Sequence, residues 1–190
     1  MKAKMINNVH LEGLLYEHDL TLKVSGSTSK TPGTEFISGT VKVATDSNIT
    51  NIVEVHYTYV TEKTSKGGIN ATFTNLKSII EGTSQCYVPN KAKENYVPTY
   101  VRIDTAIGLN DFYSENNGQV ELVSAKRNEG GFIHFIRENE LAVEEDQYGN
   151  HPRNTFEADM IVTNIRRVEA DEEKEQPEKM FLKGVIFDFR

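Results

Sequence analysis

The sequence predicts an all-β protein, made mainly of β-strands with one short helix. Most of the chain alternates apolar and polar residues, as strands with one buried face do, whereas residues 72–82 place apolar residues at helical spacing. The first alternating segment also holds an internal glycine, Gly13, which indicates a bulge, a bend or a close backbone approach. Strongly bent strands favour a small closed barrel.

The strands are assigned where alternation is bounded by turn residues. Residues 49–60 are the stretch richest in β-branched and aromatic residues, which are enriched in strands, and Asn116-Asn117-Gly118 is a strong hairpin signal. In chain order, the first expected strand covers residues 7–17 and continues after a kink over residues 20–24. The second, third and fourth cover residues 36–44, 49–60 and 100–113, and further strands cover residues 119–125, 132–136 and 156–168.

The helix has a clear apolar stripe and a clear end. Phe73, Leu76, Ile79 and Ile80 fall on one helical face, and Gly82 is a suitable stop signal. A helix between the third and fourth strands is the outline of an OB-fold, a five-stranded Greek-key barrel, here with long loop insertions. Periodicity alone equally allows other small β-barrels.

The two ends of the chain share a pattern. Residues 180–188 place Gly184 in an alternating frame similar to the one around Gly13 in residues 9–17. We therefore expect an OB-fold domain over residues 1–170 and a charged linker over residues 171–179. Residues 180–190 would then be the first strand of a second, truncated domain.

The composition excludes several classes of protein. The chain has 190 residues and no run of about 18 apolar residues, the length that a membrane span needs. Cys86 is the only cysteine, which excludes an internal disulfide and a cysteine-based zinc site. We expect a cytoplasmic protein, in the host cytoplasm if a phage encodes it, with no membrane partner.

The charge is unevenly distributed. The net charge is −7, yet residues 138–178 alone hold 13 acidic and 4 basic residues, and residues 1–137 hold 14 of each. An acidic chain argues against a duplex binder that acts by phosphate neutralisation. It leaves room for a groove lined with lysines and aromatic residues in the neutral part.

One family resembles this sequence. The segment Asn8-Val9-His10-Leu11-Glu12-Gly13-Leu14-Leu15 resembles the first strand of bacterial and phage single-stranded DNA-binding proteins, which opens N-x-V-x-L-x-G-x-L. Residues 72–82 are similar to the helix before that family's fourth strand, and residues 101–109 to its V-x-G-x-L strand. The resemblance covers residues 5–168. It implies an OB-fold that protects single-stranded DNA during replication or recombination.

Binding of single strands needs aromatic faces beside a basic track. Tyr57 and Tyr59 share one side of the third expected strand, although both would equally suit the packing of the barrel. Residues 87–100 interleave lysines and tyrosines most regularly, and an aromatic pair and a basic pair flank the hairpin signal. The candidate nucleic-acid-binding residues are Lys42, Tyr57, Tyr59, Lys63, Lys66, Tyr87, Lys91, Lys93, Tyr96, Tyr100, Phe112, Tyr113, Lys126 and Arg127.

Enzyme chemistry has little support in the sequence. The five histidines have no metal-binding spacing, and no phosphate-binding, dinucleotide-binding or nucleophile motif is present. We expect no enzyme activity, no cofactor and no metal, with single-stranded DNA as the partner. A homo-oligomer and contacts with replication or virion proteins stay open. The alternative is an OB-like structural or assembly protein, for example a phage virion component.

Overall fold

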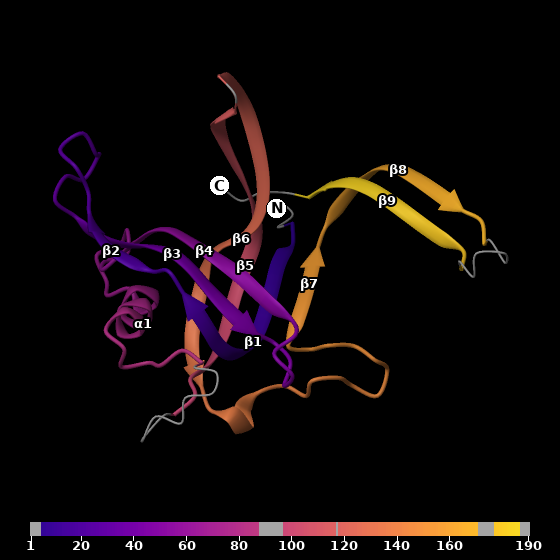
Figure 1. Cartoon of the computed structure of the whole chain (residues 1–190), viewed down its shortest axis with the longest axis horizontal. Coiled ribbons are helices and arrows are strands. Elements are labelled where there is room, and N and C mark those ends of the chain that lie inside the picture. Colours follow the sequence, from indigo (N-terminus) through magenta and orange to yellow (C-terminus); the bar gives the residue numbers. More distant parts are fainter. Residues whose placement is uncertain (1–4, 88–96, 117, 171–176, 187–190) are drawn as a thin grey trace. The chain divides into compact units, whose positions relative to one another are not determined.

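The computed structural model describes residues 5–87, 97–116, 118–170 and 177–186. These residues form β1 (Asn7–His18), β2 (Thr21–Val24), β3 (Glu35–Ala44), β4 (Ile52–Thr61), α1 (Ala71–Ile80), β5 (Tyr100–Asn116), β6 (Gln119–Ile136), a short 3-10 helix η1 (Glu138–Glu140), β7 (Asn154–Ala158), β8 (Met160–Val168) and β9 (Lys179–Ile186). The predicted all-β class with one short helix is confirmed (Figure 1). No helix in the described ranges is long and apolar enough to cross a membrane.

Five strands close into a ring. β1 pairs antiparallel with β3 and with β5, β3 pairs with β4, and β5 pairs with β6. A short parallel pairing of β4 with β6 closes the ring. The ring order is therefore β1-β3-β4-β6-β5, with α1 between β4 and β5. This closed barrel is the predicted OB-fold, in which β3 and β4 are the second and third strands and β5 and β6 are the fourth and fifth.

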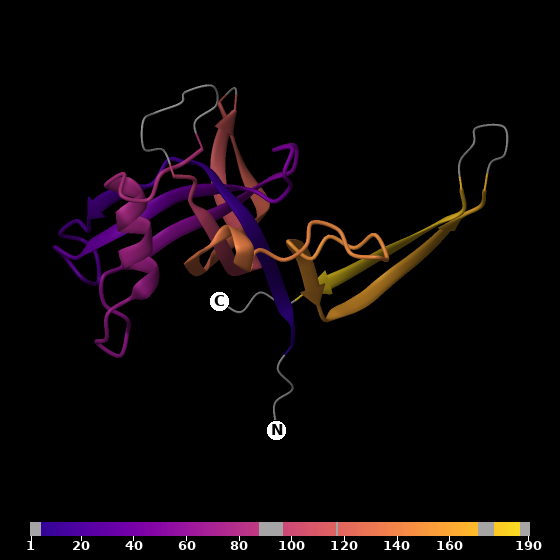
Figure 2. The ribbon, with the colours of Figure 1, turned by 90° about the horizontal axis from the view of Figure 1, so that it is seen from below.

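The core lies inside this ring. The alternating apolar residues of the strands point inward, as a period of two requires, and the apolar stripe of α1 covers them. The buried cluster is Val9, Leu11, Leu15, Leu20, Ile37, Val41, Val43, Val55, Tyr57, Phe73, Leu76, Ile79, Val101, Ile103 and Ile133. Figure 2 shows the helix beside the strands of the barrel.

The helix ends as its sequence indicates. The side chain of Asn70 caps the first turn by accepting a hydrogen bond of 3.1 Å from the Thr72 amide. At the other end Gly82 has φ of 73°, a left-handed conformation that glycine adopts without strain. The predicted stop signal at Gly82 therefore works as expected.

Glycine explains two sharp features of the barrel. A Cβ atom at Gly13 would clash with the backbone carbonyl of Ala44, so β1 and β3 approach as closely as the sequence indicated. Gly39 has φ of 135° and lies against Asp19 and Leu20, where β1 bends into β2. The bend lets one length of chain pair with β3 along its whole length.

β6 differs from expectation because it is one strand where the sequence suggested two. The predicted break at residues 126–131 is a bulge, with Gly130 and Gly131 at φ of 70° and 95°. A Cβ atom at Gly131 would clash with the carbonyl oxygen of Asp104. The glycines therefore bend the strand without ending its pairing with β5.

The chain divides differently from the expected domains. One compact unit is the barrel, residues 8–156, and the other is formed by residues 157–190 with residues 1–7, so the boundary falls before residue 170. The expected closing strand over residues 156–168 is interrupted at Asp159, and its second part, β8, pairs with β9 instead of the barrel. β6 already occupies the closing position beside β4.

Residues 180–186 form most of β9 and pair antiparallel with β8, so here they complete a hairpin rather than begin a separate domain. Gly184 lies opposite a register shift between Val162 and Asn164, and a Cβ atom there would clash with the Met160 side chain. Most of the expected linker, residues 171–176, lies outside the described residues, and Lys179 begins β9.

Candidate nucleic-acid interface

The outer face of β2, β3 and β4 is the surface to test first. OB-folds bind oligonucleotides on the face of their second and third strands and on neighbouring loops, which here means β3 and β4. Val41 and Val43 point into the core, so the alternate residues Thr40 and Lys42 point outward. The outer face continues onto β2, which pairs with the first half of β3.

An aromatic pair lies at one end of this face. The rings of Phe36 and Tyr59 contact each other with centroids 4.5 Å apart and planes tilted by 37°. The Tyr59 side chain stays 47% exposed, which leaves ring surface for a base. Lys23 lies directly opposite Phe36 in the pairing of β2 with β3, so its side chain shares the face. We call Lys23, Phe36 and Tyr59 the aromatic end.

Further lysines surround the aromatic end. Lys30 is in the loop over residues 25–34, whose Thr31 Oγ1 lies 3.0 Å from the Tyr59 hydroxyl. Lys63 and Lys66 are in the turn that follows Thr61, the residue opposite Phe36. At and around the aromatic end, four exposed lysines therefore outnumber two exposed glutamates. The lysines are Lys23, Lys30, Lys63 and Lys66, and the glutamates are Glu35 and Glu62. Within the described part of the chain none of these lysines has an ion pair.

In the middle of the outer face, two glutamates neutralise the charge of Lys42. Lys42 Nζ lies 2.9 Å from Glu17 Oε2 and 3.6 Å from Glu54 Oε1. The hydrogen bond from Lys42 to Glu17, and the charge of both carboxylates, raise the pKa of Lys42 above its usual value. A phosphate would have to compete with two carboxylates for this lysine. Lys42 is on the expected face but is poorly placed to bind.

Tyr57 belongs to the core. Its side chain is 2% exposed, and burial raises the pKa of its hydroxyl far above the usual value. No partner for this hydroxyl lies among the described residues. Of the two tyrosines that the sequence placed together, only Tyr59 reaches the surface.

The hairpin signal produces an arm with a second exposed aromatic pair. Phe112 and Tyr113 are 44% and 74% exposed on β5, and Lys126 is exposed on β6. Arg127 already forms an ion pair, because its Nε lies 3.3 Å from Glu129 Oε2. The arm rises beyond the barrel (Figure 1).

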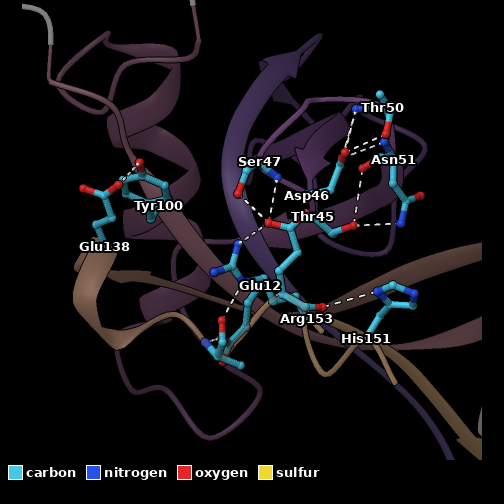
Figure 3. A network of polar contacts seen from close by, with 12 residues as sticks. Glu12, Thr45, Asp46, Ser47, Thr50, Asn51, Tyr100, Glu138, His151 and Arg153 are labelled. Atoms are coloured by element: carbon cyan, nitrogen blue, oxygen red, sulfur yellow. Dashed lines mark hydrogen bonds and ion pairs between the residues drawn. The ribbon is translucent and has the colours of Figure 1, made fainter. Parts of the chain in front are cut away.

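Tyr87 and Tyr100 line a different place, an open pocket of about 490 Å³ at the opposite end of β3 and β4. The Tyr87 ring stacks on Tyr16 with centroids 5.9 Å apart. The Tyr100 hydroxyl donates a 3.0 Å hydrogen bond to Glu138 (Figure 3). The candidates Lys91, Lys93 and Tyr96 lie outside the described residues.

Residues 138–178, which we call the acidic segment, are joined to this pocket by hydrogen bonds in their first part. Glu144 accepts a hydrogen bond from Ser47 in the turn between β3 and β4, and Arg153 donates to the Ala142 carbonyl at 2.6 Å (Figure 3). Ala44 at this end lies eight residue steps along β3 from Phe36 at the other, a span of about 26 Å at 3.3 Å per residue. The screening length is about 10 Å at 0.1 M salt, so these carboxylates leave the aromatic end little affected.

Comparison with known proteins adds one finding. The sequence model of the YorF family matches residues 5–190. The chain belongs to the YorF family. The match spans both units, including the β8–β9 hairpin. No curated protein and no solved structure matches the chain.

Two residues of the aromatic end in this YorF-family chain escaped sequence reasoning. Lys23 and Phe36 are 13 positions apart and meet only through the register of β2 on β3. The usable signal was local: Phe36 opens an alternating strand in which Ile37, Val41 and Val43 point the other way. That parity alone places Phe36 on the outer face.

The described residues hold no group of three histidine, cysteine, aspartate or glutamate side chains arranged to bind a metal ion. In the acidic loop Asp146 caps its own turn, accepting hydrogen bonds from the Tyr148 and Asn150 amides at 2.8 and 2.9 Å. A hydrogen bond from the Asn150 side chain, together with these two amide bonds, holds the pKa of Asp146 below its usual value. The carboxylate therefore has a structural role in its loop.

Proposed function

We propose that this protein binds single-stranded nucleic acid, with single-stranded DNA as its substrate, on the outer face of β2, β3 and β4. The observation that carries the proposal is the aromatic end: an exposed Tyr59 ring against Phe36, with Lys23 on the same face. Base stacking on such rings and attraction of phosphates to nearby lysines bind single strands without reading their sequence.

The charge distribution supports this location. The four lysines at and around the aromatic end outnumber the two glutamates there, and Glu138 and Glu144 lie by the pocket at the other end of β3 and β4. A strand bound here would pass between the loop over residues 25–34 and the turn over residues 62–70. Its role would be to cover single strands in the cytoplasm, without catalysis.

Binding to fluorescently labelled oligo-dT, followed by anisotropy at low salt, tests the proposal. Tyr59→Ala is expected to weaken binding by about 1–3 kcal/mol, the usual loss for one stacked base. Lys23→Ala should weaken binding and flatten its dependence on salt, because fewer counterions are released. Duplex DNA of equal length should bind more weakly than oligo-dT.

Two variants serve as matched controls. Tyr148→Ala removes a tyrosine that is 80% exposed but lies in the acidic segment, and its affinity should equal that of the wild type. Tyr57→Phe changes only a buried hydroxyl and should also leave affinity unchanged. Equal affinity of wild type and Tyr59→Ala, or no binding of oligo-dT at micromolar protein, would contradict the proposal and favour the structural or assembly alternative.

A further inference from the structure

The arm exposes apolar side chains beside acidic ones. We define the arm as residues 106–127 of β5 and β6, which pair only with each other in the part of the chain that the structure describes. Tyr113 lies opposite Leu122, and Glu115 lies opposite Val120, so these four side chains share one face. The three apolar ones are 58–74% exposed.

Among the described residues, the β8–β9 hairpin also exposes large apolar side chains, by 36–63% each. A two-stranded hairpin in water is at best marginally stable and needs a surface to pack against. The pairing register divides its side chains between two faces. One face combines apolar and basic side chains, namely Ile161, Arg166, Val168, Lys179, Phe181, Lys183 and Val185. The other is almost wholly apolar, with Met160, Val162, Ile165, Met180, Leu182 and Ile186.

The charges of the two surfaces are opposite. Asp111, Glu115 and Glu121 lie along the arm, whereas its two basic residues, Lys126 and Arg127, lie at its base next to the barrel strands. Arg127 is paired there with Glu129. The two strands of the hairpin contain four basic residues and no acidic residue. One of the four, Arg167, is already paired with Glu178 at 2.6 Å and with Glu169 at 3.6 Å. The other three basic residues, Arg166, Lys179 and Lys183, all lie on the face that combines apolar and basic side chains, which we call the mixed face.

We propose that the mixed face of the β8–β9 hairpin binds the arm of a second copy of this chain. Glu115 and Asp111 lie on the arm face that carries Tyr113 and Leu122, so acidic and apolar side chains would meet basic and apolar ones. Complementary charge fixes the register of such a contact and steers its formation. The contact is head-to-tail, so it produces a ring if the rotation closes and a filament if it does not.

Self-association of the full chain tests this, with mass measured by light scattering after size exclusion. The wild type is expected to gain mass with concentration at low salt and to lose it at about 1 M salt, where charges are screened within about 3 Å. Asp111→Lys with Glu115→Lys reverses the arm, and Arg166→Glu with Lys183→Glu reverses the hairpin. Each double variant alone should stay monomeric, because both of its surfaces then have the same sign.

An equimolar mixture of the two double variants should regain the wild-type mass, because each reversed surface then meets its opposite. Such a rescue would exclude misfolding as the reason why each double variant alone fails to associate. Glu81→Lys, an exposed charge reversal at the end of α1, should associate like the wild type. A wild type that stays monomeric, a mixture that stays monomeric, or either double variant that associates alone would overturn the proposal.

A separate variant distinguishes the two faces of the hairpin. Leu182→Ser removes an apolar side chain from the almost wholly apolar face, whose one basic residue, Arg167, is already paired, and is expected to leave the salt dependence of association intact. Loss of association in Leu182→Ser, with wild-type mass in both charge-reversed variants, would assign the contact to the almost wholly apolar faces of two hairpins. The head-to-tail proposal would then be wrong.

Discussion

The hydroxyl of Tyr59 lies 3.0 Å from Thr31 Oγ1, so one hydrogen bond joins the loop over residues 25–34 to the exposed ring at the aromatic end. The same ring contacts Phe36 on β3. Tyr59 is therefore held on two sides while its ring surface stays accessible. A ring that is already oriented needs less ordering when a base stacks on it, and lower ordering cost means higher affinity.

Thr31→Val keeps the size of the side chain and removes this hydrogen bond. A typical hydrogen bond contributes about 0.5–1.5 kcal/mol, so we expect affinity for oligo-dT to fall by about two- to tenfold. Ser27→Ala, in the same loop, is the control and should bind like the wild type. Equal affinity of Thr31→Val and Ser27→Ala would show that the loop does not orient Tyr59 for binding.

Lys42 gives a prediction in the opposite direction. Glu17 and Glu54 occupy its ammonium group, so the double change Glu17→Gln with Glu54→Gln should free Lys42 for phosphates. We expect higher affinity for oligo-dT at low salt and a steeper loss of affinity as salt rises, by about one more phosphate contact. Adding Lys42→Ala to the double variant should reverse the gain. An unchanged salt slope would place the bound strand away from Lys42.

The sequence predicted the barrel because its signals are local. Alternation located β1, β3, β4 and β5, and helical spacing with Gly82 located α1, because each pattern depends only on neighbouring residues. The destination of the last two strands could not be read in this way. β8 and β9 alternate as barrel strands do, and only the pairing of β6 with β4 shows that the closing position is taken.

The candidate site was only partly predictable for a similar reason. Tyr57 and Tyr59 have the same parity, but the register of β4 on β3 shifts between Ile37 and Gly39, so one tyrosine is buried and the other exposed. Strand alternation predicts the same burial for both tyrosines, because it cannot reveal a shift in the pairing register. The partners of Lys42 likewise come from β1 and β4, whose pairing with β3 the sequence does not state.

Gly13 permits a test of the close approach between β1 and β3. Gly13→Ala would place a Cβ atom against the Ala44 carbonyl. Such overpacking lowers the free energy of unfolding by about 1–3 kcal/mol or more, because the strands must shift to make room. We expect a clear drop in the urea midpoint of unfolding. Gly26→Ala is the control, because a Cβ atom there meets nothing within 4 Å. Equal midpoints for the two variants would mean that the strands separate at no cost.

Glu12 links the barrel to the acidic segment, and its contribution should depend on pH. Its side chain is 4% exposed and accepts hydrogen bonds of 2.6 Å from both Arg102 Nε and the Ala142 amide. Burial alone would raise the pKa of Glu12, but these bonds and the charge of Arg102 outweigh it and hold the pKa below its usual value. The folded state therefore favours the carboxylate.

Glu12→Gln should lower the free energy of unfolding by about 1–3 kcal/mol near neutral pH, as expected when a buried charged hydrogen bond is lost. Because the folded pKa lies below the unfolded one, the carboxylate stabilises the fold above about pH 4.3 and loses that effect as pH falls through the folded pKa. Urea unfolding across this range should show wild type and Glu12→Gln converging in acid. Glu121→Gln, on the exposed arm, should match the wild type throughout. A difference between wild type and Glu12→Gln that stays constant with pH would show that packing around residue 12, and not its charge, holds the acidic segment to the barrel.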